Sequence, residues 1–144
     1  MLRRLTSTSA SWATVPLRLA LGIAFIGHGA QKVLGSFNGP GLAKFTSFPA
    51  PFPFMRPTWL WMGAAALSEL IGGILVLLGL FTRVGAFLIA CVMLVATFGV
   101  LWPAFFAPAG MELAVAFLGM ALALLITGGG QASVDLMIGG GRRR

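Results

Sequence analysis

Charged side chains are scarce in this sequence, and acidic ones are the scarcest. Only 9% of the 144 residues are charged, with three Asp and Glu against ten Lys and Arg. A soluble domain of this length needs a polar surface, which so few charged groups cannot supply. Because 58% of the residues are hydrophobic, the composition predicts an integral membrane protein that contacts the lipid bilayer.

Cysteine and histidine are each present once, as Cys91 and His28. A single cysteine excludes an internal disulfide, a Cys-x-x-Cys redox pair and a zinc cluster. A single histidine excludes a bis-histidine haem site and leaves few ligands for a metal ion. The glycine runs 128–130 and 139–141 follow no predicted strand and precede no Lys-Ser or Lys-Thr pair, so they form no phosphate loop. We therefore expect no metal site and no evident resident cofactor.

The basic residues do not indicate a nucleic-acid partner, although the net charge is +7. They stand at the ends of apolar runs, as membrane topology signals do, and not in a stripe on a polar surface. If the apolar runs cross a membrane, the side that holds the N-terminus has more basic residues than the other side. The first side has Arg3, Arg4, Arg83 and 142–144, and the second has Lys32, Lys44 and Arg56. This asymmetry predicts that both termini are cytoplasmic in a bacterial-type inner membrane.

Four apolar runs are long enough to cross a bilayer, at about residues 16–34, 58–80, 84–102 and 110–127. A helix needs about 20 residues to cross roughly 30 Å of hydrocarbon. Residues 35–57 are rich in proline and phenylalanine, so they suit a loop at the membrane surface and not a span. We predict an all-α membrane protein, a four-transmembrane-helix bundle over residues 14–135, between a flexible basic tail at 1–13 and a basic tail at 136–144.

The N-terminal region also has features of a signal peptide, with Arg3 and Arg4 ahead of the apolar stretch 19–26. Arg18 interrupts this pattern, and residues 27–30 make a poor cleavage site. We therefore interpret the first apolar run as a retained helix that makes the protein multi-pass.

Small residues gather on one face of two of the predicted helices. At about 100° per residue, the second run places Leu67, Ile71 and Ile74 opposite a face of small residues that includes a carboxylate. Small residues let helix backbones approach closely, so we expect such faces to point inward. They are Ala65, Ala66, Glu69, Gly72 and Gly73 in the second run, and Glu112, Ala116, Gly119, Ala123 and Thr127 in the fourth.

Glu69 and His28 are the polar residues at membrane depth that most suggest chemistry. Each has two interpretations that the sequence leaves open: a structural hydrogen bond between helices, or a proton-handling group in a buried site. His28 and Lys32 are one turn apart, and Gln31 borders them. We predict that these three residues and Glu69 line one outward-opening pocket.

Other ionisable residues are expected near the membrane boundaries. Lys32 and Glu112 fall near the outer boundary, where they could pair and contact a ligand. Arg18, Arg83 and Asp135 form a predicted polar cluster at the inner boundary, for which helix anchoring and topology are the favoured roles. Cys91 shares a bulky apolar face with Leu88 and Val95, so we expect it to be dispensable.

Several segments together resemble the DoxX family. Residues 18–32, Arg-Leu-Ala-Leu-Gly-Ile-Ala-Phe-Ile-Gly-His-Gly-Ala-Gln-Lys, are similar to the family's first-helix signature. Glu-Leu-Ile-Gly-Gly at 69–73 and Leu-Gly-Leu-Phe-Thr-Arg at 78–83 are similar to its second-helix motif. Glu112 and the run from Thr127 to Asp135 also match, so the resemblance covers about residues 16–135.

The resemblance implies a four-helix bundle with a link to redox chemistry. The family name derives from a small subunit of an archaeal thiosulfate:quinone oxidoreductase, and other members associate with membrane oxidoreductase or thiol-stress systems. The resemblance suggests that the chain is a subunit of a quinone-linked membrane system. A quinone would lie between the first two helices, and the partner would be a membrane or soluble oxidoreductase. Because the chain carries no electron carrier of its own, whether it is an enzyme stays open. The alternatives are a non-catalytic anchor or assembly partner of another complex and a small-molecule carrier, which would need a homo-oligomer.

Overall fold

The computed structural model describes residues 6–8, 10–106, 108 and 110–139, and in this part of the chain every regular element is helical. The all-helical prediction is therefore confirmed. Four long helical segments dominate: α2 (Thr14–Leu34), α4 (Thr58–Leu78), α5 (Thr82–Val95), which the π-helical turn η2 (Ala96–Leu101) extends, and α6 (Glu112–Thr127). The shorter elements are η1 (Ser36–Asn38), α3 (Gly41–Thr46) and α7 (Val134–Ile138).

Local sequence explains where the long helices begin and end. Pro16 falls in the first turn of α2, where its missing N–H costs no hydrogen bond. Gly35 ends α2 and Gly79 ends α4, each with a positive φ that glycine adopts without strain. Residues 35–57 do not form a long helix, because their prolines interrupt it, but α3 forms within them and packs against α2 and α4.

Helices α2 and α4 make the closest contact of the fold. A Cβ atom on Gly29 would lie 2.5 Å from the backbone of Leu70, and one on Gly73 would lie 2.7 Å from the backbone nitrogen of Ile26. The two backbones therefore touch directly, as small residues allow. The predicted faces of α4 are confirmed, since Glu69 and Gly73 are buried while Ile71 is exposed.

The predicted inward face of the last long helix is wrong. Helix α6 buries Ala114, Ala121 and Leu124, while Ala116 and Gly119 are exposed. A Cβ atom on Gly119 would meet no atom within 4 Å. The buried face lies beside the predicted one and combines two alanines with Leu124, and small residues facing lipid carry no penalty that would prevent this arrangement.

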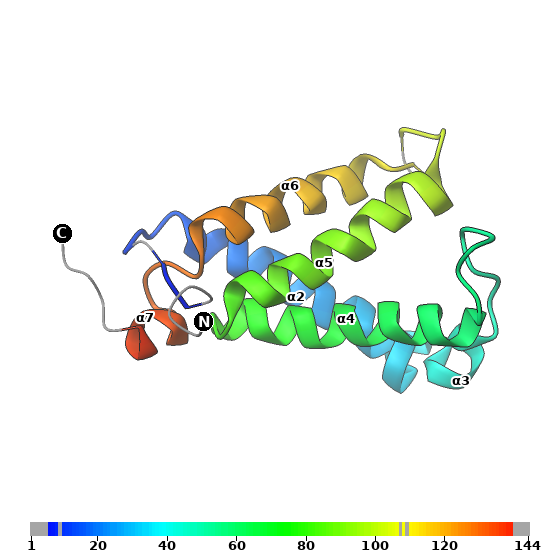
Figure 1. Cartoon of the computed structure of the whole chain (residues 1–144), viewed down its shortest axis with the longest axis horizontal. Coiled ribbons are helices and arrows are strands. Elements are labelled where there is room, and N and C mark those ends of the chain that lie inside the picture. Colours follow the sequence, from blue (N-terminus) through cyan, green and yellow to red (C-terminus); the bar gives the residue numbers. More distant parts are fainter. Residues whose placement is uncertain (1–5, 9, 107, 109, 140–144) are drawn as a thin grey trace.

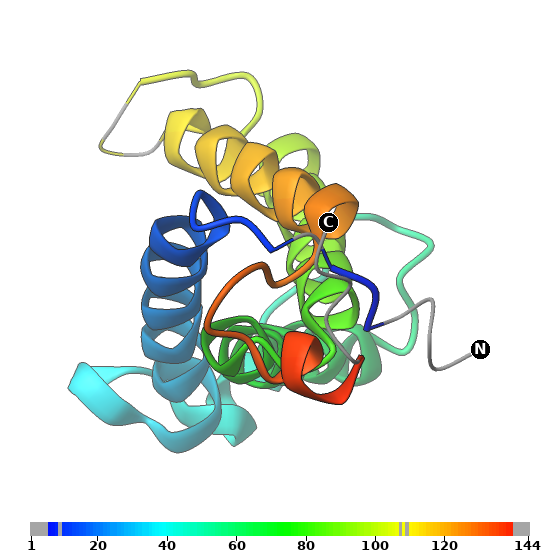
Figure 2. The same cartoon turned by 90° about the vertical axis from the view of Figure 1, so that its left-hand side faces the viewer.

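The four long segments are closest together at one end and diverge toward the other. Figures 1 and 2 show α5 and α6 moving away from α2 and α4 toward the end that carries α3. We call this the wide end, and the end that carries α7 the narrow end. The core lies between the four helices and includes Leu21, Phe25, Val76, Ile89 and Leu124.

The described part of the predicted N-terminal tail makes contacts at the narrow end. The Ser11 carbonyl accepts a hydrogen bond from the Gln131 N–H at 2.9 Å, and Thr8 Oγ1 accepts one from the Gly130 N–H at 2.5 Å. Thr6 is buried. Residues 6–8 and 10–13 therefore pack against the turn that joins α6 to α7.

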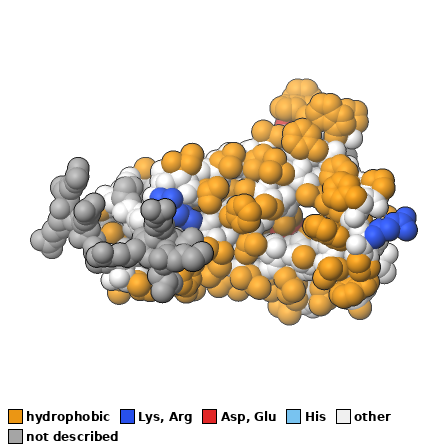
Figure 3. Space-filling model, in the orientation of Figure 1, with side chains coloured by type: hydrophobic (Ala, Val, Ile, Leu, Met, Phe, Trp, Pro, Cys, Tyr) orange, Lys and Arg blue, Asp and Glu red, His pale blue; other side chains and the backbone are white. Residues whose placement is uncertain are grey.

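The surface is largely apolar, as the orange side chains in Figure 3 show. Many large hydrophobic residues are exposed on the long helices, among them Ile23, Leu67, Phe87 and Ile126. Within the described residues, Thr58–Leu78 and Thr82–Leu101 are long and apolar enough to cross a membrane, and Glu112–Thr127 is a shorter apolar helix. A water-soluble protein rarely exposes so continuous an apolar surface.

Candidate functional site

The polar cluster at the narrow end consists of Arg18, Arg83 and Asp135, and these side chains bond to backbone groups of the same chain. Arg18 lies on α2, where its guanidinium donates hydrogen bonds of 2.8–3.2 Å to five backbone carbonyls: those of Val76, Leu77, Gly129, Gln131 and Ala132. Two of these carbonyls belong to the last turn of α4, where a cation also complements the helix dipole. Arg18 thus joins α2, α4 and the α6–α7 turn.

Asp135 and Arg83 complete this cluster with further backbone contacts. The Asp135 carboxylate accepts hydrogen bonds from the N–H groups of Phe81 at 2.7 Å and Thr82 at 2.8 Å, at the start of α5. A carboxylate at a helix N-terminus satisfies N–H groups that have no partner in the helix. Arg83 donates to the carbonyls of Ser7 and Ile126. The three residues that the sequence predicted to cluster do lie at one end, and their contacts join helix ends.

A second polar group lies between α2 and α4, toward the wide end. Lys32 Nζ is 2.5 Å from Glu69 Oε1 and 2.6 Å from Oε2. The Glu69 side chain is only 2% exposed, whereas that of Lys32 is 25% exposed. The sequence suggested Glu112 as a partner for Lys32, but the close approach of α2 and α4 brings Glu69 to it instead.

An aromatic ring from the loop helix covers the Lys32 ammonium. Lys32 Nζ lies 5.2 Å from the centroid of the Phe45 ring, which α3 carries. The negative face of an aromatic ring attracts a cation at this distance. Lys32 therefore connects α2 to both α4 and α3.

His28 lies one turn before Lys32 on α2 and remains available for a ligand. Its ring centroid is 6.2 Å from that of Phe25, and no hydrogen bond joins its ring to another described residue. The His28 side chain is exposed, and it also borders a cavity. Its two ring nitrogens can therefore donate to or accept from a molecule that enters there.

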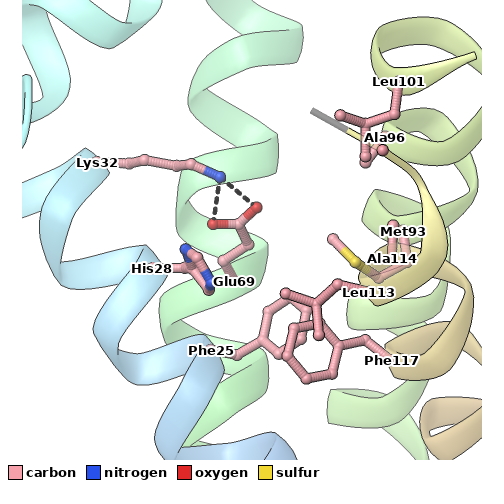
Figure 4. A pocket seen from close by; sticks show the side chains of 11 residues that line it. Phe25, His28, Lys32, Glu69, Met93, Ala96, Leu101, Leu113, Ala114 and Phe117 are labelled. Carbon is pink, nitrogen blue, oxygen red and sulfur yellow. Dashed lines mark hydrogen bonds and ion pairs between the residues drawn. The ribbon is translucent and has the colours of Figure 1, made fainter. Parts of the chain in front are cut away.

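These three polar side chains form one wall of a cavity of about 200 Å³. Figure 4 shows the Lys32–Glu69 pair and His28 on one side and apolar side chains on the other. Phe25 and Phe117 pack edge to face at one end, with ring centroids 5.4 Å apart. The remaining wall comes from α5, η2, α6 and the segment before α6: Met93, Ala96, Leu101, Gly110, Leu113 and Ala114.

Two predicted site residues do not line this cavity. Gln31 lies about 100° around α2 from Lys32, and its backbone carbonyl packs against Gly39. Glu112 begins α6 but its neighbours Leu113 and Ala114 reach the cavity instead. The apolar wall was missed by sequence reasoning, because leucines and alanines at a cavity do not differ in sequence from those that face lipid.

The cavity combines a cation, a carboxylate and an imidazole with an apolar wall. Such a site can orient a small polar ring by hydrogen bonds, shield it from water, and exchange protons with it. Among the described residues no group of three His, Cys, Asp or Glu could hold a metal ion. The ammonium, carboxylate and imidazole of this wall can supply binding, orientation and proton transfer.

Comparison with known families gives one match. The family model described as DoxX matches residues 13–102, which contain His28, Lys32 and Glu69 as well as Arg18 and Arg83. No curated protein and no solved structure matches the chain.

Proposed function

Because the chain belongs to the DoxX family and is a membrane protein of that type, we propose that it is a subunit of a quinone-linked membrane redox system. In this proposal the cavity beside Lys32 and Glu69 holds the head group of a quinone. The observation that carries it is the placement of an ion pair with a buried carboxylate, beside His28, on one wall of an otherwise apolar cavity.

The energetic cost of that placement supports a ligand site. A charged side chain at membrane depth costs about 3 kcal/mol on insertion scales, and such residues in membrane proteins commonly mark sites and pathways. An ion pair that served only to join two helices would be best fully enclosed by protein. Here the pair borders a cavity, together with an imidazole that no other described residue holds.

The proposed topology has four membrane-crossing segments in a bacterial-type inner membrane, with both termini in the cytoplasm. The narrow end is then cytoplasmic and the wide end is external. Helix α6 spans about 24 Å at 1.5 Å per residue, so it needs its apolar flank or local thinning of the bilayer to cross roughly 30 Å. Arg83, at the start of α5, and the arginines 3, 4 and 142–144 in the sequence outnumber Lys32, Lys44 and Arg56, which supports this orientation.

The proposed chemistry assigns proton transfer to this chain and electron transfer to a partner. Reduction of a quinone to a quinol consumes two electrons and two protons. An oxidoreductase partner supplies the electrons, and Lys32 donates a hydrogen bond to a quinone carbonyl. His28 and Glu69 relay the two protons from water to the ring oxygens, each taking up one proton for the one that it passes on.

Quinone binding by variants of the purified full-length protein tests this proposal. We expect Glu69→Gln and His28→Phe each to weaken binding of decylubiquinone at least tenfold, because the first removes the carboxylate charge from the cavity wall and the second removes both ring nitrogens. Gln31→Ala is the matched control, since Gln31 is a polar neighbour on the same helix that does not line the cavity. Thermal unfolding checks that each variant is folded.

Two results would contradict the proposal. Equal affinity of all three variants for decylubiquinone would remove the cavity as its site. Absence of any quinone binding by a protein that purifies stably with another membrane protein would favour the role of an anchor or assembly partner.

A further inference from the structure

The cavity reaches the molecular surface between α2 and α6. Two of its lining residues are exposed: His28 on α2, and Leu113 on α6, which is 56% exposed. These two helices contact each other far less than α2 contacts α4. Figure 1 shows them separating toward the wide end. The cavity lies on that side, because Lys32, Leu101 and Gly110 line it. The opening is therefore lateral, on the side of the bundle.

The approach from the wide end is covered. Phe45 of α3 lies over the Lys32 ammonium. Residues of the loop after α3 pack on η2, since a Cβ atom on Gly99 would lie 2.8 Å from both Pro51 and Phe52. Phe45, Pro51 and Phe52 therefore narrow the approach to the ion pair from the wide end.

The lateral opening falls at hydrocarbon depth in the proposed topology. Glu69 is one residue beyond the centre of α4, and His28 is four residues beyond the centre of α2. At 1.5 Å per residue, His28 lies only about 6 Å from the middle of a hydrocarbon layer whose half-thickness is about 15 Å. The opening thus faces acyl chains and not water.

The size of the cavity limits what it can enclose. Sites that bury a whole drug-sized ligand usually measure about 300–1,000 Å³. A cavity of about 200 Å³ accommodates a single polar ring or a comparably small head group. Any longer part of the ligand must lie outside the cavity, beside α2 and α6.

We propose that the cavity is loaded from the bilayer through the opening between His28 and Leu113, and that its ligand is an amphiphile with a compact polar head and a long apolar tail. The head contacts Lys32, Glu69 and His28, while the tail stays among the lipid chains. This inference rests on the proposed function for the transmembrane placement of α2 and α4, and adds to it the route and the ligand class.

Binding kinetics in lipid nanodiscs test the route with decylubiquinone as the probe. Leu113→Trp places a large ring at the opening, so we expect at least a tenfold lower association rate. Leu122→Trp is the matched control, because Leu122 is an exposed leucine of the same helix that does not line the cavity, and its rate should stay within twofold. If Leu113→Trp has no effect while Phe45→Ala speeds association, the ligand enters from the water side and the inference is wrong.

A spin-label measurement decides the route even if no quinone binds, in which case the proposed function fails on its own. In the Cys91→Ala protein, a label on His28→Cys should collide more with oxygen, which concentrates in lipid, than with a water-soluble nickel chelate. Leu122→Cys supplies the lipid reference and Lys44→Cys the aqueous reference. A label at position 28 that behaves like the one at position 44 would overturn lateral entry.

Discussion

Lys32 and Glu69 stabilise each other because the Glu69 carboxylate is buried and needs a partner charge. Glu69 is 2% exposed and holds Lys32 through both carboxylate oxygens. Removing one partner of a buried ion pair typically costs about 3–5 kcal/mol, whereas replacing both by apolar residues of similar size is often neutral. The stability of the α2–α4 contact and the polarity of the cavity can therefore be separated by mutation.

A double-mutant cycle tests how strongly Lys32 and Glu69 are coupled. We expect Glu69→Leu alone to lower the free energy of unfolding by about 3 kcal/mol, because it leaves the Lys32 ammonium without its partner. Adding Lys32→Met should restore most of that loss while quinone binding stays abolished. Unfolding of purified protein in detergent gives the four stabilities. If the double variant is no more stable than Glu69→Leu, the pair is not coupled as the structure indicates.

Two glycines on different helices have opposite surroundings, and replacing each by alanine tests how α4 and α6 pack. Gly73 on α4 lies against the α2 backbone, while Gly119 on α6 faces open space. We expect Gly73→Ala to destabilise the protein by at least about 1 kcal/mol, because backbone atoms cannot yield as side chains do. Gly119→Ala should be neutral or stabilising by up to about 1 kcal/mol, since alanine favours a helix. Equal losses in both variants would contradict the packing described here.

At the narrow end, the contact between Asp135 and the start of α5 can be tested in the same way. Asp135→Ala removes the acceptor for two N–H groups at the start of α5, so we expect a loss of about 1–2 kcal/mol of unfolding free energy. Met137→Ala on the same short helix is the control, because that side chain is 83% exposed. Quinone binding by folded Asp135→Ala protein should be unchanged, because the narrow end does not line the cavity. A selective loss of binding would mean that this cluster belongs to the site.

The contrast between α4 and α6 explains how far the sequence could predict this fold. Apolar runs bounded by proline and glycine predicted helical segments because length and breakers are local properties. The buried face of α4 was predictable because Glu69 and its glycines share it, and a carboxylate avoids lipid. The face of α6 was not, since small and large apolar residues are both tolerated in hydrocarbon. The partner of Lys32 depends on the register of α2 against α4, which no local pattern specifies.

The distribution of charge along the whole molecule carries the last prediction, that both termini are cytoplasmic. Arg83 lies at the narrow end and Lys44 at the wide end. In the sequence, three more arginines follow α7. The positive-inside rule then places the narrow end in the cytoplasm. Cys91 is the only thiol and is exposed on the apolar surface, so Cys91→Ala should fold normally and give a background without thiols. In that background, a membrane-impermeant maleimide added to intact cells should label Lys44→Cys. It should label Met137→Cys only after the membrane is opened. Labelling of position 137 but not position 44 in intact cells would invert the topology, and it would place the covered wide end, with Phe45 over Lys32, on the cytoplasmic side.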